Sequence, residues 1–149
     1  MAEENTIVLK GKGHHDEGIV GTAISPGEAI ELAADGEYDP QSSAQAAALK
    51  GGLKIAKEAA LNAGGTIDDA YAAGDVVFFY TACPGDHVLA LVKSGEDIDV
   101  GDKLVVEGGG SGLFVEAAGT ETKFQLEALE DTGGALGAND HVKCRVLAG

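Results

Sequence analysis

The stretch "PGDHVLALV" (84–92) decides the fold class, because it places a short apolar run directly after a glycine–aspartate pair. Glycine readily adopts the positive φ of a tight turn, and the aspartate can accept hydrogen bonds from nearby backbone N–H groups. The same plan occurs in "PGEAIEL" (26–32), "AGDVVFFY" (73–80) and "VGDKLVVE" (100–107), each with an apolar run typical of a strand. The structural turns that this plan predicts involve Gly27, Gly74, Asp75, Gly85, Asp86, Gly101 and Asp102.

Three later runs continue the series: "LFVEA" (113–117), "KFQLEALE" (123–130) and "HVKCRVL" (141–147). In the last run, Val142, Cys144 and Val146 alternate with charged residues, which is the period of a half-buried strand. The segment "EGGGSG" (107–112) lacks the lysine and the following helix of a phosphate-binding loop, so we predict a hairpin connection there. Together these patterns predict an all-β fold, a compact β-barrel or sandwich.

Residues 42–65 are rich in alanine and harder to interpret. Alanine and lysine favour a helix, but the Gly51–Gly52 pair interrupts it, and residues 53–58 also fit a strand. We expect at most one short helix in this part. Near the start, one short apolar strand precedes a polar, glycine-rich stretch, which predicts an extended N-terminal arm and loop over residues 1–18. Residues 19–149 are expected to form a single β-rich domain.

The chain has 149 residues, of which 25 are acidic and 10 basic, so its formal net charge is -15. Such a charge repels phosphate backbones, and only one basic residue is an arginine, so we expect no nucleic-acid partner. The acidity fits a protein adapted to concentrated salt. An acidic mesophilic protein also fits, because nine lysines are more than that adaptation favours.

The longest apolar runs fall well short of the roughly 20 residues of a membrane span, so no membrane partner is expected. The first residues, "MAEENTIVLKG", are acidic and lack the apolar region of a secretory signal, which predicts folding in a cytoplasm. Cys83 and Cys144 lie in apolar, strand-like contexts that favour buried free thiols, although a disulfide between them remains an alternative.

A metal site is best sought in "GHHDEG" (13–18), where His14, His15, Asp16 and Glu17 all carry ligand atoms. Adjacent residues of a strand point to opposite faces, and no second cluster supplies further ligands. The remaining histidines, His87 and His141, are isolated in the sequence. We therefore predict a solvated loop, no metal site and no cofactor.

The segment "TIDDAYAAGD" (66–75) holds three aspartates, but turn chemistry explains each of its residue types. Ile67 and Tyr71 are expected to anchor a loop against the core, and Asp68 or Asp69 to cap a turn. Elsewhere, Ser111 lacks the surroundings of a nucleophile elbow, and Cys83 has no basic neighbour in the sequence to lower its pKa. The sequence thus predicts no catalytic residues and no enzyme.

Several segments, in order along the chain, resemble a family of capsid decoration proteins, the cement or head-stabilising proteins of tailed viruses. "IDDAYAAGDVV" (67–77) resembles one segment of that family. "VLKGKGHHDEGIVGTAISPGEAIEL" (8–32) is similar to its opening, and "PGDHVLALVKSGEDIDVGDKLVVEGGGSGLF" (84–114) to its middle. "ALEDTGG" (128–134) resembles its tail. Each segment is weakly specific by itself, and the ordered set covers most of the chain; the acidic composition favours a haloarchaeal virus as the source.

The resemblance implies a structural virion protein with no enzymatic reaction. It would bind the outer surface of an icosahedral capsid at three-fold or quasi-three-fold positions, as a homotrimer in contact with the major capsid protein, and stabilise the shell. An apolar arm can complete a sheet in a capsid subunit by strand addition, and the residues expected to do so are Thr6, Ile7, Val8 and Leu9. The same residues also fit an ordinary first strand of the domain.

Two other functions remain open from the sequence. A biotinyl- or lipoyl-type carrier is suggested by "GEDIDVGDKL" (95–104), but Lys93 lacks the neighbouring methionine usual at the modified lysine. A carbohydrate- or cell-surface-binding module needs exposed aromatic rings, and the chain has only seven aromatic residues, several of them in core-like strands.

Overall fold

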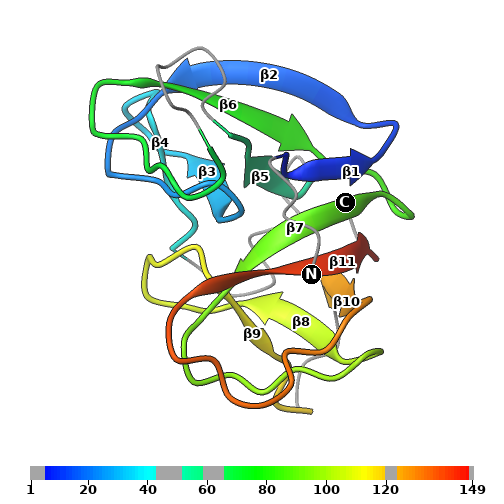
Figure 1. Ribbon diagram of the computed structural model, residues 1–149. Helices are drawn as coiled ribbons and strands as arrows, with labels where there is room; N and C mark the ends of the chain where they lie inside the picture. The colour runs from blue at the N-terminus through cyan, green and yellow to red at the C-terminus, as the bar shows by residue number, and fades with distance from the viewer. Residues whose placement is uncertain (1–5, 43–51, 59–65, 120–123, 148–149) are drawn as a thin grey trace.

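The computed structural model describes residues 6–42, 52–58, 66–119 and 124–147. These residues form eleven strands and no helix, so the all-β fold is confirmed (Figure 1). Most of the alanine-rich stretch in which a short helix was allowed lies outside the described residues. Residues 52–58 of this stretch are described and contain a strand, Lys54–Ala56, as one of the two interpretations predicted. No helix long and apolar enough to cross a membrane occurs in the parts of the chain that the structure describes.

The first sheet closes on itself as a small barrel. Its order is β1-β7-β11-β10-β8-β9, and β9 also pairs with β7 through Val92 and Phe114. Because β11 runs along one edge of β7, β1 and β9 share the other edge at its two ends. The strands are β1 (Val8–Lys10), β7 (His87–Val92), β8 (Lys103–Val106), β9 (Phe114–Glu116), β10 (Leu126–Ala128) and β11 (Asp140–Val146).

The second sheet has the order β2-β6-β5-β3-β4. An isolated bridge between Val20 and Tyr38 brings the chain after β2 beside the start of β4, so this sheet also curls strongly. In Figure 1 it lies above the barrel, with β1 and β7 between the two groups. Its strands are β2 (His14–Ile19), β3 (Ala29–Leu32), β4 (Tyr38–Pro40), β5 (Lys54–Ala56) and β6 (Val76–Thr81).

The larger hydrophobic core joins the two sheets. It combines Ile55 and Tyr80 of the second sheet with barrel residues such as Val88 and Phe114, all at most 1% exposed. A smaller cluster around Val77 and Phe79 fills the second sheet from within. Because one core takes side chains from both sheets, the described residues pack as a single body.

The predicted turn glycines adopt the left-handed backbone, at φ of 93° for Gly27, 89° for Gly74, 94° for Gly85 and 93° for Gly101. In each of these four turns the acidic side chain after the glycine accepts a hydrogen bond from the backbone N–H three residues before it. The donor–acceptor pairs are Ser25–Glu28 (3.1 Å), Ala72–Asp75 (2.8 Å), Cys83–Asp86 (2.8 Å) and Asp99–Asp102 (2.8 Å). We call these four turns the acid corners.

Each acid corner also attaches the start of one strand to another part of the fold. Its glycine N–H donates to a backbone carbonyl that is distant in the sequence, and the next strand begins directly after the acidic residue. The four acceptors are the carbonyls of Ala56, Val20, Val146 and Ala128, at 2.8–2.9 Å. The corners therefore fix where β3, β6, β7 and β8 begin.

Two connections test the sequence interpretation further. Residues 107–112 join β8 to β9, whose antiparallel register includes Val105 opposite Val115, so the hairpin is confirmed. The solvated loop expected at residues 13–18 is wrong, because His14–Ile19 is a strand paired along its full length with β6. β2 lies at the edge of its sheet and most of its residues are exposed, so its sequence lacks the alternation of apolar and polar residues by which a strand is recognised.

Candidate functional site

A hydrogen-bonded centre ties the loop after β1 to the acid corner before β7. Asp86, 4% exposed, accepts bonds from the Tyr80 hydroxyl (2.6 Å) and the Cys83 N–H (2.8 Å) through Oδ2. Its Oδ1 accepts a bond from the Lys12 N–H at 3.0 Å, and the Gly13 N–H donates to the Tyr80 hydroxyl oxygen at 2.5 Å. This centre holds the start of the chain against the sheets.

The ionisation of the two side chains follows from this geometry. Burial acts to raise the pKa of Asp86, but the hydrogen bonds that the carboxylate accepts outweigh burial and hold its pKa below the ordinary value. Burial raises the pKa of Tyr80 to about 12, and its bond to Asp86 adds to the shift. The pair is therefore an ionised acceptor and a neutral donor near neutral pH, which suits a structural contact.

The glycines of "KGKG" (10–13) are required by close packing. A Cβ on Gly13 would lie 2.1 Å from the Thr81 carbonyl oxygen, and one on Gly11 would lie 2.0 Å from the Tyr80 hydroxyl oxygen. Because the obstructing atom at Gly13 is a backbone carbonyl oxygen, no side chain fits at this position. The glycine spacing in the segment that resembles the decoration-protein opening thus has a packing cause.

The four arm residues Thr6–Leu9 lie along the barrel. Ile7 is fully buried, its carbonyl accepts a bond from the Leu89 N–H at 2.8 Å, and Val8 is opposite Val88. Of the two interpretations of this segment, the structure shows the paired first strand. Contact of the same residues with a capsid stays a prediction.

A groove of about 430 Å³ runs along this segment. It lies between β1 on one side and β2, β6 and the chain after β5 on the other, and β1 is the terminal strand of its sheet. Val8, Leu9 and Phe78 form the apolar part of the groove lining, and the rest of the lining is mostly polar. Its other lining residues are Thr6, Lys10, Gly11, His15, Lys57 and Glu58.

Glu58 links this groove to the arm. Its Oε1 accepts bonds from the Thr6 hydroxyl (2.8 Å) and the Ile7 N–H (3.2 Å). Its Oε2 is buried and has no hydrogen-bond partner within the described part of the chain. An unsatisfied buried carboxylate oxygen is costly, so a donor that enters the groove would be stabilised there. Sequence reasoning missed Glu58, because no local pattern distinguishes it from other acidic residues.

The rim of the groove carries a histidine–lysine contact. Lys57 Nζ lies 2.8 Å from His15 Nδ1. Burial, followed by the charge of Lys57, lowers the pKa of His15. The imidazole is therefore neutral near pH 7 and accepts the lysine's hydrogen bond.

Two of the three aspartates of residues 66–75, Asp69 and Asp75, stabilise turns through their side chains. The Asp69 carboxylate accepts bonds from the N–H and hydroxyl of Thr66 at 2.9 and 3.2 Å, while the Asp68 side chain is 85% exposed and its Oδ1 lies 3.9 Å from His141 Nδ1. Tyr71 is buried, and its hydroxyl donates to the Lys57 carbonyl at 2.7 Å. Ile67 packs against the larger core. The predicted anchors and the predicted turn cap are thus confirmed.

The remaining candidates for chemistry have structural partners. The Ser111 hydroxyl donates to Glu107 at 3.0 Å, and Glu107 also pairs with Lys93, whose hydrogen bond lowers the pKa of that carboxyl and makes it a weak base. Cys83 and Cys144 are both free thiols, as the sequence favoured. No group of three metal-ligating side chains occurs among the residues that the structure describes.

The aromatic side chains leave little surface for stacking against a sugar. Four of the seven, Tyr71, Phe79, Tyr80 and Phe114, are buried, and the others are half-buried. Tyr38 and Phe78 pack against the smaller core. These positions suit packing rather than glycan binding.

Comparison with solved structures relates the fold of this chain to that of a phage head protein. No protein-family model matches the chain, and no curated protein matches its sequence. The fold is similar to the crystal structure of the head fiber gp8.5 N base in bacteriophage phi29, with a TM-score of 0.54. The match covers 91% of this chain and 94% of the phage protein at 12% sequence identity, so it shows a shared fold over almost the whole of both chains.

Proposed function

We propose that this chain is a structural protein of a tailed-virus head. The observation that carries the proposal is the fold, which matches the head fiber base over 91% of this chain. The ordered segments that resemble capsid decoration proteins support the same class independently. The structural partners found for Asp69 and Ser111 fit a protein that works by binding.

In this proposal the chain sits on the outer surface of the icosahedral shell, as a homotrimer at three-fold or quasi-three-fold positions. It contacts the major capsid protein and stabilises the shell after synthesis in the host cytoplasm. The charge of -15 supports an outward position, since such a surface is repelled by packaged DNA. The same acidity supports a haloarchaeal host.

The arm and its groove are the proposed contact with the shell. No described strand pairs with the edge of β1 that faces the groove, and an extended segment of a shell subunit can add there as a further strand. A donor on that segment would satisfy Glu58 Oε2, which is buried without a partner among the described residues. Leu9 and Phe78 supply the apolar surface that fixes the register of the added strand.

Binding to shells tests this function. Purified chain mixed with viral heads stripped of accessory proteins is expected to sediment with them, to appear as exterior density at three-fold positions, and to raise the temperature at which the heads burst. Leu9→Asp is expected to abolish binding while the variant remains folded. Leu32→Asp is the matched control, because Leu32 is 57% exposed on the second sheet, away from the groove. Heads that neither bind the chain nor gain resistance to bursting would refute the proposal.

A further inference from the structure

One row of side chains crosses five strands on the outside of the barrel. The strand registers place Lys10 opposite His87, His87 opposite Arg145, Arg145 opposite Glu127, and Glu127 opposite Lys103. Cross-strand partners lie on the same face of a sheet, with Cβ atoms about 5 Å apart. These five side chains therefore form one continuous line across the strands.

The row concentrates positive charge in an acidic chain. Together with Lys12 and Lys143 beside it, it holds five of the ten basic residues of a molecule whose net charge is -15. We call Lys10, Lys12, Lys103, Lys143 and Arg145 the basic row. Burial, then the charges of Lys10, Arg145 and Lys143, lower the pKa of His87, as expected for an imidazole surrounded by cations.

Only part of this charge is neutralised inside the molecule. Glu127 pairs with both Lys103 and Arg145. No ion pair of the described residues involves Lys10, Lys12 or Lys143, and all three are exposed. The basic row is therefore able to accept carboxylates from another molecule.

A complementary surface exists on the same chain. Glu96, Asp99, Asp102 and Glu116 gather where the β7–β8 connection meets β9, and we call them the carboxylate cluster. Burial, then Asp102, Glu96 and Asp99, raise the pKa of Glu116, which reports their mutual repulsion. No ion pair within the described ranges neutralises these four side chains.

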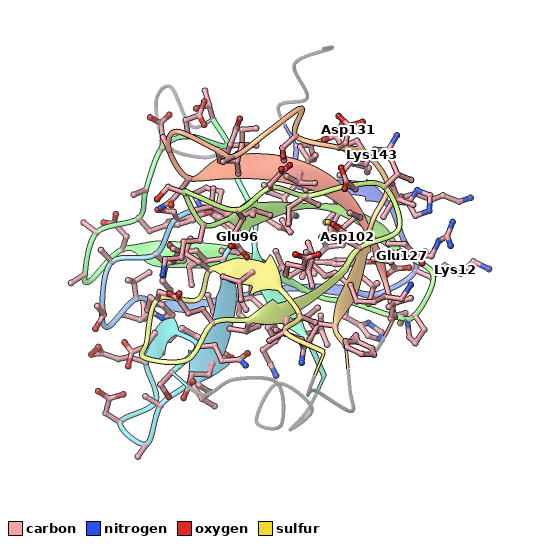
Figure 2. All side chains as sticks on the ribbon, turned by 90° about the horizontal axis from the view of Figure 1, so that it is seen from below. Lys12, Glu96, Asp102, Glu127, Asp131 and Lys143 are labelled. Atoms are coloured by element: carbon pink, nitrogen blue, oxygen red, sulfur yellow. The ribbon has the colours of Figure 1, made fainter. Side chains whose placement is uncertain are left out.

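The centre of the basic row and the carboxylate cluster lie on different strands of the closed barrel. Around it, β9 stands two strands from β11 in one direction and three in the other, so the cluster and the centre of the row lie on different sides. In Figure 2, Lys12 and Glu127 appear at one side of the molecule, Glu96 lies nearer its middle, and Asp102 lies between Glu96 and Glu127. Within one copy, Lys103 at the end of the row adjoins Asp102 of the cluster. Lys12 and Lys143, on the loop after β1 and on β11, lie farther from the cluster, so their charges are available to the cluster of a neighbouring copy.

We propose that the basic row of one copy packs against the carboxylate cluster of a second copy of this chain, in a head-to-tail contact that repeats around a closed ring. Opposite charges at such a contact select the partner and fix its orientation. A contact between two different surfaces closes into a ring when its rotation allows. The count of three copies rests on the proposed function, whereas the identity of the two surfaces rests on the structure.

Charge reversal tests the two surfaces separately. Wild-type chain at micromolar concentration and physiological ionic strength is expected to have about three times the 15.0 kDa chain mass by light scattering. Lys143→Glu with Arg145→Glu, or Asp99→Lys with Glu116→Lys, is expected to reduce that mass to one chain. All four residues are exposed, and none of their side chains forms a corner hydrogen bond. Thermal melting confirms that each variant is folded.

The decisive measurement combines both reversals in one chain. Such a variant has a negative row and a positive cluster, so it is expected to regain the threefold mass, which a variant that merely misfolds cannot do. Asp16→Lys with Glu17→Lys is the control, because it changes the net charge as much as Asp99→Lys with Glu116→Lys does, at exposed residues of β2, and is expected to leave the mass unchanged. A monomeric wild type, a single-surface variant that keeps the full mass, or a combined variant that stays monomeric would overturn this inference. A charge-reversed variant that is monomeric but still binds shells would support the proposed function independently of the ring.

Discussion

The Tyr80 hydroxyl donates a 2.6 Å hydrogen bond to Asp86 Oδ2, and this bond joins the end of β6 to the acid corner that begins β7. β6 belongs to the second sheet and β7 to the barrel, so the contact stands where the two sheets meet. Backbone bonds from Lys12 and Gly13 fasten the loop after β1 to the same point. Three segments thus depend on one buried carboxylate.

Replacing Asp86 should therefore cost more stability than replacing the acid of another corner. Asp86→Ala leaves two N–H groups and one hydroxyl without their acceptor, and we expect a loss of about 3 kcal/mol in the free energy of unfolding. Asp75→Ala is the matched control, because Asp75 is exposed and its carboxylate accepts the one corner bond from Ala72, so about 1 kcal/mol is expected. Urea titration measures both, and equal losses would contradict the role given to Asp86.

The same carboxylate should make stability depend on acid pH. The pKa of Asp86 in the folded chain lies below the ordinary 3.8, so its contribution is fully present above the unfolded pKa and is lost as pH falls through the folded pKa. Stability of the wild type should drop more steeply below about pH 4 than that of Asp86→Asn. Parallel slopes for the two proteins would show that Asp86 is not stabilised by its bonds.

Glu28 should act in the opposite sense. Burial raises its pKa from 4.5 to about 7, so the unfolded carboxyl ionises at lower pH than the folded one. This term destabilises the fold increasingly from about pH 4.5 to about pH 7 and then levels off. Glu28→Gln keeps an acceptor for the Ser25 N–H and should raise the free energy of unfolding at pH 8 by up to about 3 kcal/mol, with no gain at pH 4.

The exposed Glu17→Gln provides the control for that measurement, since it removes the same charge from the surface strand β2. It should change stability little at either pH. A gain for Glu28→Gln that is equal at pH 4 and pH 8 would mean that the ionisation of the buried Glu28 carboxyl does not account for the effect.

Two glycines should separate backbone strain from steric exclusion. Gly74 has a φ of 89° and open space where a Cβ would lie, so Gly74→Ala should cost about 1–2 kcal/mol from the backbone conformation alone, and Gly74→Val somewhat more. Gly13→Ala drives a Cβ to 2.1 Å from the Thr81 carbonyl oxygen and should cost more than Gly74→Ala. Thermal midpoints of these variants test the order, and an unchanged midpoint for Gly74→Val would refute the turn assignment.

The two thiols should react at different stages of unfolding. Cys83 is half-buried, whereas Cys144 is fully buried and burial raises the pKa of its thiol strongly. Because the thiolate is the reactive form, a thiol reagent should modify Cys83 in the native protein and Cys144 only after denaturation. Mass spectrometry of the modified chain counts the groups. If neither cysteine reacts in denaturant unless a reductant is added, the two cysteines form a disulfide.

Local chemistry explains which features the sequence predicted well. Gly85 and Asp86 lie next to each other, and the turn that they form needs only the few residues around them, so it was predictable without knowledge of the fold. The alternation of Val142, Cys144 and Val146 likewise identified the buried face of β11. Such features depend on residues a few positions apart.

Features that depend on distant residues were not predictable in this way. The pairing of β1 with β7 joins Val8 to Val88, and the bond from Thr6 to Glu58 spans 52 positions. Edge strand β2 has no apolar alternation because solvent covers its side chains, so its polar residues were assigned to a loop. The basic row appears only after the strand registers are known, since its members lie far apart along the chain.

The placement of β11 between β7 and β10 has a consequence for the moment at which this protein becomes functional. β11 follows every other described strand in the sequence, yet it occupies the interior of the barrel wall. During translation the ribosome must therefore deliver these residues before the wall can be completed, and the nascent chain exposes apolar surface until then. A stop codon shortly before residue 140 would leave a gap in the wall and yield an aggregating product rather than a slightly shorter working one.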